Sequence, residues 1–183
     1  GDLSRVFTYT AKTIPGVHGA PTPGVIFEDG LHGNKFKYVI NGHSTAQVVG
    51  NIGCLDYNGA GLTLAKGPLA AIAGNTSVVF KPSTATLNLM AGVWMGAAAL
   101  SDTTKTGAAW VQYRGQNSSC LVDSTTDISI GYSLKAVNAT FAAVKDAASG
   151  TRVSFENYLV ALIARTTNDE GLISCYISCG ANA

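Results

Sequence analysis

The fold class is decided by a stretch near the end of the chain, Leu172-Ile173-Ser174-Cys175-Tyr176-Ile177-Ser178-Cys179-Gly180. Apolar and polar residues alternate there with a period of two, and β-branched and aromatic side chains are frequent, which is typical of a half-buried strand. Successive side chains of a strand point to opposite faces, so Ile173, Cys175, Ile177 and Cys179 share one face. We expect that face to point into a core, because isoleucine and cysteine are among the most often buried residue types.

The chain has four cysteines. Cys175 and Cys179 lie about 13 Å apart on a strand that rises roughly 3.3 Å per residue, whereas a disulfide needs Cα atoms within about 7 Å of each other. These two cysteines therefore do not bridge each other. Two alternatives stay open: they pair with Cys54 and Cys120 in an undetermined connectivity, or all four are small buried thiols. Zinc is disfavoured, because no Cys-x2-Cys pair or neighbouring histidine completes a tetrahedral ligand set.

The composition fits a single domain whose surface carries few charges. A chain of 183 residues is long enough to bury roughly 70% of the surface that it exposes when unfolded. Charged residues make up 13% of the chain and the net charge is +1, against a usual charged fraction of about 25%. So few charges do little to keep protein surfaces apart, which favours packing against other protein.

The same composition disfavours two classes of partner. The 12 Lys and Arg residues are scattered singly among 11 Asp and Glu residues, so no basic stripe is available to release counterions from phosphate, and we expect no nucleic-acid partner. No apolar run reaches the about 18 residues of a membrane-spanning helix. The richest stretch, 87–100, is interrupted by Asn88, Gly92 and Gly96, and we expect no membrane partner.

Residues 1–35 are predicted to form an extended N-terminal arm. Pro15, Pro21 and Pro23 stand there among several glycines, and residues of these two types at that density interrupt regular strand pairing. The arm also carries apolar side chains that a solvated tail would lack. We expect them to lie on the arm's own domain or to clasp a neighbouring protein. These candidate contact residues are Val6, Phe7, Tyr9, Ile14, Val25, Ile26 and Phe27.

Residues 36–183 are predicted to form a mainly β domain. The run 35–40 leads through Asn41-Gly42 into 43–49, and Asn-Gly between alternating runs is a strong hairpin signal. Short strands separated by turn signals every 8–12 residues or so indicate an antiparallel sandwich or barrel. Only 68–73 and 87–99 are candidates for a short helix. Later strands are expected at 77–80, 108–114, 119–122, 126–130, 140–145, 152–155, 158–164 and 172–179.

The residues that catalysis would need are not arranged for it in the sequence. The run 42–46 is a near miss for Gly-x-Ser-x-Gly, with Ala46 in place of the second glycine. The acidic pairs Glu28-Asp29 and Asp169-Glu170 each precede a glycine and are typical of solvated turns. No two histidines among His18, His32 and His43 have a recognised metal spacing. We therefore expect a protein that is not an enzyme and that holds no cofactor or metal.

Aromatic residues support one alternative function. A row of exposed aromatic rings would stack against sugars, so a carbohydrate-binding or adhesion domain competes with a purely structural role. Trp110 and Tyr113 are separated by an odd number of positions and so point to opposite faces of one strand. We expect most of the aromatic side chains to fill the core. The aromatic residues considered for sugar stacking are Trp94, Trp110, Tyr113, Tyr132, Phe141, Phe155, Tyr158 and Tyr176.

From about Ala97 to Cys179 the chain resembles the small β-rich decoration, or cement, proteins of tailed-bacteriophage capsids. The resemblance lies in a pattern of strands and turns. Its runs are Ala99-Leu100-Ser101-Asp102-Thr103-Thr104, Trp110-Val111-Gln112-Tyr113-Arg114-Gly115, Leu121-Val122-Asp123-Ser124-Thr125-Thr126, Gly131-Tyr132-Ser133-Leu134-Lys135-Ala136-Val137-Asn138-Ala139-Thr140 and Ala161-Leu162-Ile163-Ala164-Arg165-Thr166-Thr167.

This resemblance implies a compact, β-tulip-like barrel without catalytic activity. Proteins of this kind sit on the outer surface of the assembled capsid, usually as homotrimers, and hold neighbouring major-capsid subunits together with a β domain and an N-terminal arm. Our expectation from the sequence is therefore a structural virion protein whose partners are the major capsid protein and further copies of itself.

Overall fold

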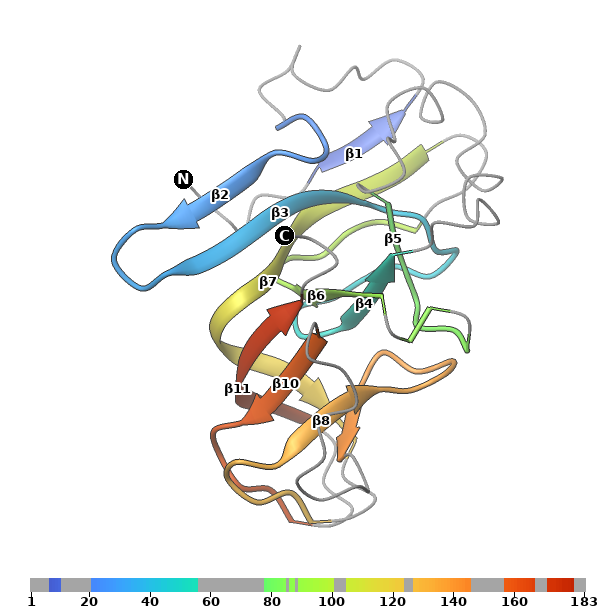
Figure 1. Ribbon diagram of the computed structural model, residues 1–183. Coiled ribbons are helices and arrows are strands. Elements are labelled where there is room, and N and C mark those ends of the chain that lie inside the picture. The colour runs from blue at the N-terminus through green and yellow to red at the C-terminus, as the bar shows by residue number, and fades with distance from the viewer. Residues whose placement is uncertain are drawn as a thin grey trace.

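The computed structural model describes residues 7–10, 21–55, 78–84, 86–87, 89–100, 105–123, 127–145, 157–166 and 171–179. Within these residues all regular structure is β-strand, which confirms the predicted fold class (Figure 1). The strands are β1 (Phe7–Thr10), β2 (Ile26–Asp29), β3 (Asn34–Asn41), β4 (Ile52–Leu55), β5 (Val78–Phe80), β6 (Met90–Trp94), β7 (Lys105–Val122), β8 (Ser133–Ala136), β9 (Ala143–Lys145), β10 (Asn157–Ala161) and β11 (Gly171–Cys179).

Strand β11 has the alternation that its sequence predicts. Ile173, Cys175, Ile177 and Cys179 are each at most 4% exposed, whereas Leu172 on the opposite face is 48% exposed. The period of two therefore separates a core face from a surface face along the whole strand.

A five-stranded barrel closes around this core face. β11 pairs with β7 and β10, β10 pairs with β8, β8 with β9, and β9 returns to β7 through Val122 and Ala143. Because the circuit closes, each of its strands has a partner on both sides. The core cluster along this barrel comprises Ile52, Cys54, Met90, Val93, Tyr113, Cys120, Val122, Ile128, Leu134, Ala136, Ala143, Leu159, Ala161, Ile173, Cys175, Ile177 and Cys179.

A second circuit uses β7 again. Strand β7 pairs with β3 and with β6, β6 pairs with β4, β4 with β5, and β5 returns to β3. Its core cluster comprises Val39, Leu55, Val79, Ala91, Trp94, Ala98, Ala109 and Val111. The pairs β3–β5 and β7–β9 are parallel, and every other strand pair is antiparallel. The expected antiparallel barrel is thus a mainly antiparallel one.

Strand β7 joins the two circuits, and it changes partner near Gly115. Its first part pairs with β3 and its last part with β11, and Arg114 is in register with both. Gly115 has a φ of 101°, a left-handed conformation that glycine adopts without steric penalty. The carboxamide of Gln112 lies where β7 changes partner. Its Nε2 donates to the carbonyl oxygens of Arg114 (3.2 Å) and Gln116 (2.9 Å). These hydrogen bonds satisfy backbone groups where the strand pairing changes.

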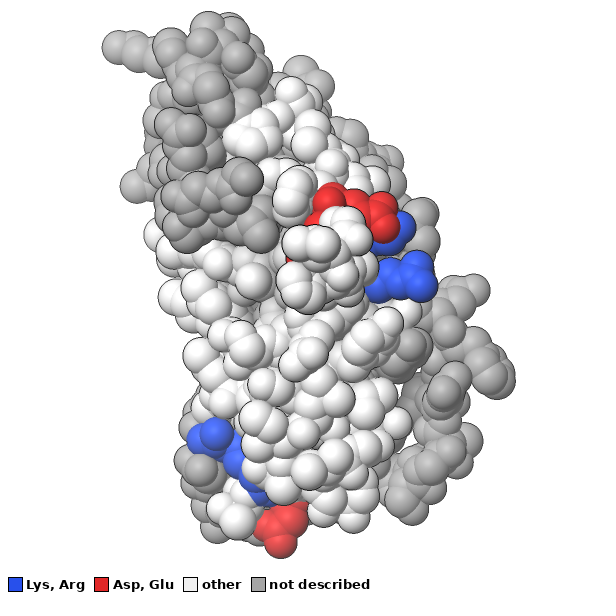
Figure 2. Space-filling view, turned by 90° about the vertical axis from the view of Figure 1, so that its left-hand side faces the viewer, with Lys and Arg blue, Asp and Glu red and all other residues white. Residues whose placement is uncertain are grey.

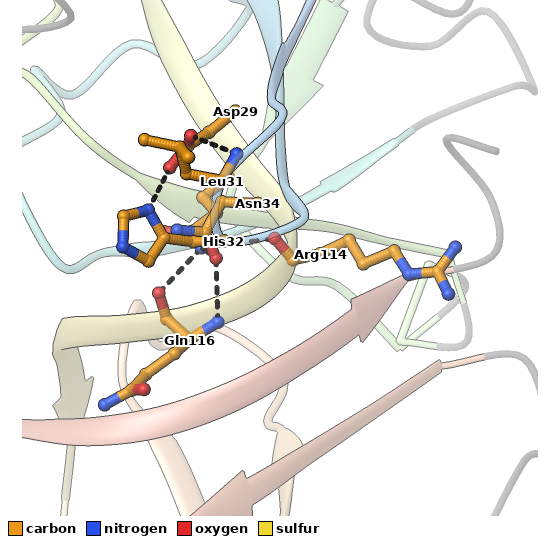
Figure 3. Close-up of polar contacts among 7 residues, drawn as sticks. Asp29, Leu31, His32, Asn34, Arg114 and Gln116 are labelled. Carbon is orange, nitrogen blue, oxygen red and sulfur yellow. Dashed lines mark hydrogen bonds and ion pairs between the residues drawn. The ribbon is translucent and has the colours of Figure 1, made fainter.

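The β2–β3 hairpin is fastened to the same place. Oδ1 of Asn34 accepts the backbone N–H of Gln116 at 3.0 Å, as Figure 3 shows. Oε1 of Gln112 accepts a hydrogen bond of 2.9 Å from Nδ2 of Asn117, which is itself buried. Buried carboxamides therefore fix the strand on which both circuits depend.

The predicted hairpin at Asn41-Gly42 is wrong. β3 pairs with β7 and β5, and among residues 43–49 the only strand-like pairing described is an isolated bridge between Gln47 and Ala98. Asn41 is fully buried, and its Nδ2 donates to the carbonyl oxygens of Thr45 and Ala99, each at 2.9 Å. A buried carboxamide with one local acceptor and one tertiary acceptor is held in the interior, so Asn41 does not act as a surface turn residue.

Three other local predictions are also corrected. The strands expected at 108–114 and 119–122 are one continuous strand, β7. The strand expected at 126–130 is a single bridge between Ile128 and Arg165. The helix candidate 87–99 contains β6, whose five residues are all buried, and a short run buried on both faces gives the same sequence signal in a strand as in a helix. The candidates 68–73 and 152–155 lie outside the described residues.

The described parts of the predicted arm add strands to their own domain. β1 pairs with β7, from Phe7 opposite Ala108 to Thr10 opposite Lys105, and β2 pairs with β3. The predicted domain boundary after residue 35 falls inside β3. Residues 1–6 and 11–20 lie outside the described residues.

We predict that Gly115→Ala destabilises the protein more than Gly131→Ala. Both glycines have positive φ, but a Cβ at Gly115 would overlap Oδ1 of Asn34, whereas a Cβ at Gly131 meets nothing within 4 Å. Gly131→Ala should cost about 1–2 kcal/mol through backbone strain alone. Gly115→Ala should cost at least about 1 kcal/mol more. Urea unfolding of both variants measures this, and equal losses would contradict the role assigned to the Asn34 contact.

Candidate protein-binding surface

His43 has a structural role in its loop. Its Nδ1 accepts the backbone N–H of Thr45 at 3.1 Å, and its ring packs edge-on against Phe141 at 5.7 Å between centroids. Burial lowers the pKa of His43, and the nearby charge of Lys81 lowers it further. A neutral imidazole whose Nδ1 accepts a backbone amide is suited to holding the loop. The ring is therefore engaged with its own loop, and this contact gives the near-miss motif at 42–46 no catalytic geometry.

The acidic residues at the β2–β3 turn are engaged locally. Oδ1 of Asp29 accepts the N–H of Leu31 at 3.0 Å, and Oδ2 lies 2.7 Å from Nδ1 of His32 (Figure 3). The hydrogen bond with His32 is the main reason why the pKa of Asp29 lies below its usual value. Glu28 forms an ion pair of 3.2 Å with Lys35 across the hairpin. These groups fix a turn, as their sequence pattern predicts.

Across the described residues, no group of three or more His, Cys, Asp and Glu side chains is placed to hold a metal ion. In the same part of the chain, no helix is long and apolar enough to cross a membrane.

The four cysteines are all buried and free. Burial raises the pKa of the Cys54 thiol to about 12. A hydrogen bond with Cys175, together with burial, raises the pKa of Cys120, and burial also raises that of Cys179. A thiol that stays protonated is a poor nucleophile and a poor metal ligand. Of the two alternatives that the sequence leaves open, the structure contains the buried thiols.

Three of the eight aromatic side chains considered for sugar stacking are buried in the core, and Tyr132 and Phe141 are half-buried. Trp94 and Tyr113 are at most 4% exposed and Trp110 is 9% exposed. Tyr176 is 37% exposed on the outer face of β11. The side chains of Phe155 and Tyr158 lie outside the described residues.

The arm residues that the sequence marks for contact include a patch on β2 and the residue before it. Val25, Ile26 and Phe27 are 45%, 52% and 37% exposed, and we call them the edge patch. Phe27 packs against Phe36 and Trp110, with ring centroids 5.9 Å and 6.3 Å away. Phe7 and Tyr9 lie in β1, and nothing is described of their side chains. Val6 and Ile14 lie outside the described residues.

The structure reveals a second apolar patch that the sequence reasoning missed. Val48 and Val49 are 55% and 41% exposed, and Leu172 on β11 is 48% exposed. Gly50 follows Val48 and Val49 in the sequence and lies against Leu172, because a Cβ at Gly50 would overlap the Leu172 side chain. The Gly50 carbonyl also accepts the N–H of Leu121 on β7. We call Val48, Val49 and Leu172 the barrel patch. The outward position of Leu172 in the alternation was the only sequence signal for it.

The far end of the barrel carries an open hollow of about 400 Å³ lined by Asp127, Ile128, Ser129, Ala164, Arg165 and Thr166. Ile130 and Ile163 are close to these residues in sequence and are 70% and 51% exposed.

Charged side chains are sparse in this protein, at 13% of the residues. On the face that Figure 2 shows, Lys, Arg, Asp and Glu gather in two small groups, and the described surface between them is uncharged. This surface is suited to contact with protein.

A scan against protein-family models and a search of curated proteins found no match to this chain.

We predict that no thiol of the native protein reacts with Ellman's reagent within minutes, because each one is buried. All four should react once the protein is unfolded without a reductant. Absorbance at the wavelength of the released thiolate gives both counts. Fewer than four thiols in the unfolded, unreduced protein would indicate a disulfide, and rapid reaction of the native protein would contradict the burial.

Proposed function

We propose that this protein is a structural virion protein that decorates a bacteriophage capsid and cements it by binding neighbouring major-capsid subunits. Its place is the outer capsid surface, and it has no catalytic role. The observation that carries the proposal is a rigid, doubly closed β fold with apolar patches on a sparsely charged surface.

The position of the resembling segments supports this proposal. The run 110–115 lies in β7, the run 131–140 contains β8, and the run 161–167 begins at the last residue of β10. The runs 110–115, 121–126 and 131–140 therefore overlap β7 and β8, whereas 161–167 has only Ala161 in a strand, and the pattern contains no chemical motif.

The barrel patch is the proposed contact with the shell. Val48, Val49 and Leu172 are each about half exposed, so covering them would contribute roughly 1 kcal/mol per side chain before the entropy of association is subtracted. Such contacts are weak singly. A shell that presents many equivalent sites strengthens binding whenever one protein, or one oligomer, reaches more than one of them.

The alternative is a carbohydrate-binding or adhesion domain, and three of its eight candidate aromatic side chains do not support it. Trp94, Trp110 and Tyr113 are buried in the cores and are not available to stack against a sugar ring. A glycan array distinguishes the two functions, since the proposed structural protein should bind shells and no glycan.

We predict that Leu172→Asp weakens binding to shells assembled from the major capsid protein of the same virus by at least about tenfold, because a charge would be desolvated in an apolar contact. Ile163→Asp is the matched control, since Ile163 is similarly exposed, at 51%, but lies outside the barrel patch. Co-sedimentation with the shells measures both affinities. Equal affinities of wild type and Leu172→Asp would exclude this patch, and no binding by wild type would refute the function.

A further inference from the structure

Strand β2 is an edge strand of the sheet. In the described part of the chain it pairs with β3 alone, at the end of the strand order, whereas the strands of both circuits are paired on two sides. Within the described residues β1 is a second edge, because it pairs with β7 alone. Ile26, the first residue of β2, is 52% exposed. Natural edge strands are usually shielded by charge, proline or a bulge, and here the charged residues Glu28 and Asp29 fill the second half of the strand and leave Ile26 and Phe27 without such shielding.

The register of the hairpin determines which backbone groups face outward. The N–H of Tyr38 donates to the carbonyl of Val25 at 2.9 Å, so Val25 faces β3. In an antiparallel pair, residues alternate between facing the partner and facing away. Phe27 and Asp29 therefore also face β3, and the N–H and C=O groups of Ile26 and Glu28 point away from it.

We propose that β2 pairs with β2 of a second copy of this chain, antiparallel about a two-fold axis at Phe27. Ile26 of each copy then lies opposite Glu28 of the other, and their outward N–H and C=O groups form four backbone hydrogen bonds. Phe27 faces its own symmetry mate in a non-hydrogen-bonded pair, with Cα atoms about 4.5 Å apart. Both rings extend the aromatic group that Phe27 forms with Phe36 and Trp110.

The position of Glu28 and the conformation of Gly24 favour a two-fold axis at Phe27 over an axis at Glu28 or Ile26. A two-fold axis at Glu28 would place two carboxylates directly opposite each other, which is destabilising. An axis at Ile26 would place Glu28 opposite Gly24, whose φ of 96° departs from a strand. With the axis at Phe27, Glu28 keeps its ion pair with Lys35 and lies opposite Ile26 of the second copy, whose cross-strand neighbour is Lys37. Lys37 itself is buried, at 8% exposed, so this register is favoured because it keeps the two Glu28 carboxylates apart.

A second copy is the occupant that this edge fits best. The edge is complementary to itself, and a chain with a net charge of +1 and 13% charged residues has little long-range repulsion to oppose self-association. The pairing is independent of the proposed function, because it uses the edge patch and leaves the barrel patch uncovered. It predicts a two-fold dimer, in contrast to the trimer that the family resemblance implies.

Cysteine cross-linking tests the register. Phe27→Cys should form a disulfide-linked dimer under mild oxidation, because a disulfide needs Cα atoms within about 7 Å. Ile26→Cys and Glu28→Cys are matched controls that should not cross-link, since the symmetry-related positions lie about 8–9 Å apart. The four native cysteines are buried and leave the readout clear. Non-reducing electrophoresis gives the dimer fraction, and sedimentation equilibrium of the wild type gives its mass.

Proline substitution tests the backbone contact separately. Ile26→Pro removes an outward N–H and no hydrogen bond between β2 and β3, and proline is tolerated on edge strands. It should raise the dimer dissociation constant at least about tenfold, because each dimer loses two hydrogen bonds. Ile26→Val keeps the N–H and should change the constant by no more than about twofold.

A mass of twice 18.8 kDa, cross-linking at position 27 alone and weakening by Ile26→Pro would support the pairing. A monomer or trimer at all concentrations would overturn it. So would cross-linking at position 26 or 28 in place of 27, or equal dissociation constants for Ile26→Pro and Ile26→Val.

Discussion

The carboxamide of Gln112, hydrogen bonded to the carbonyl oxygens of Arg114 and Gln116, is the interaction on which the rest of this structure depends. It satisfies the backbone where β7 changes partner from β3 to β11. Both closed circuits use β7, so its path sets the position of one circuit relative to the other. The side chain of Asn34 holds the β2–β3 hairpin against the same segment of β7, because its Oδ1 accepts the backbone N–H of Gln116.

Closure of the sheet separates the interior of this protein from its surface. Reactive groups are enclosed: the four thiols are buried, burial raises the pKa of the Cys54 thiol to about 12, and His43 is held by its own loop. The described surface keeps a few exposed aliphatic side chains, few charges and an edge strand at β2. The proposed contacts with other protein, at the barrel patch and at the β2 edge, rest on these features.

The local pattern predicted some strands well and failed at others for identifiable reasons. β11 was predictable because it has one buried and one solvated face, so its alternation is visible in the sequence. β6 was not, because all five of its residues are buried and no alternation remains. The Asn41-Gly42 signal failed because Asn41 is buried and makes a tertiary hydrogen bond to the carbonyl of Ala99 that no local rule contains. The barrel patch was missed because Leu172 approaches Gly50, which follows Val48 and Val49, only after folding.

By itself, the sequence determined the β class, the inward face of the last strand and the scarcity of charge, because each is a property of residue type and short-range periodicity. Tertiary structure decided which strands pair, where the circuits close, that the thiols stay free and which apolar side chains remain exposed. These outcomes depend on contacts between segments far apart in the chain, such as β3 with β7 and β7 with β11, and no local pattern specifies those contacts.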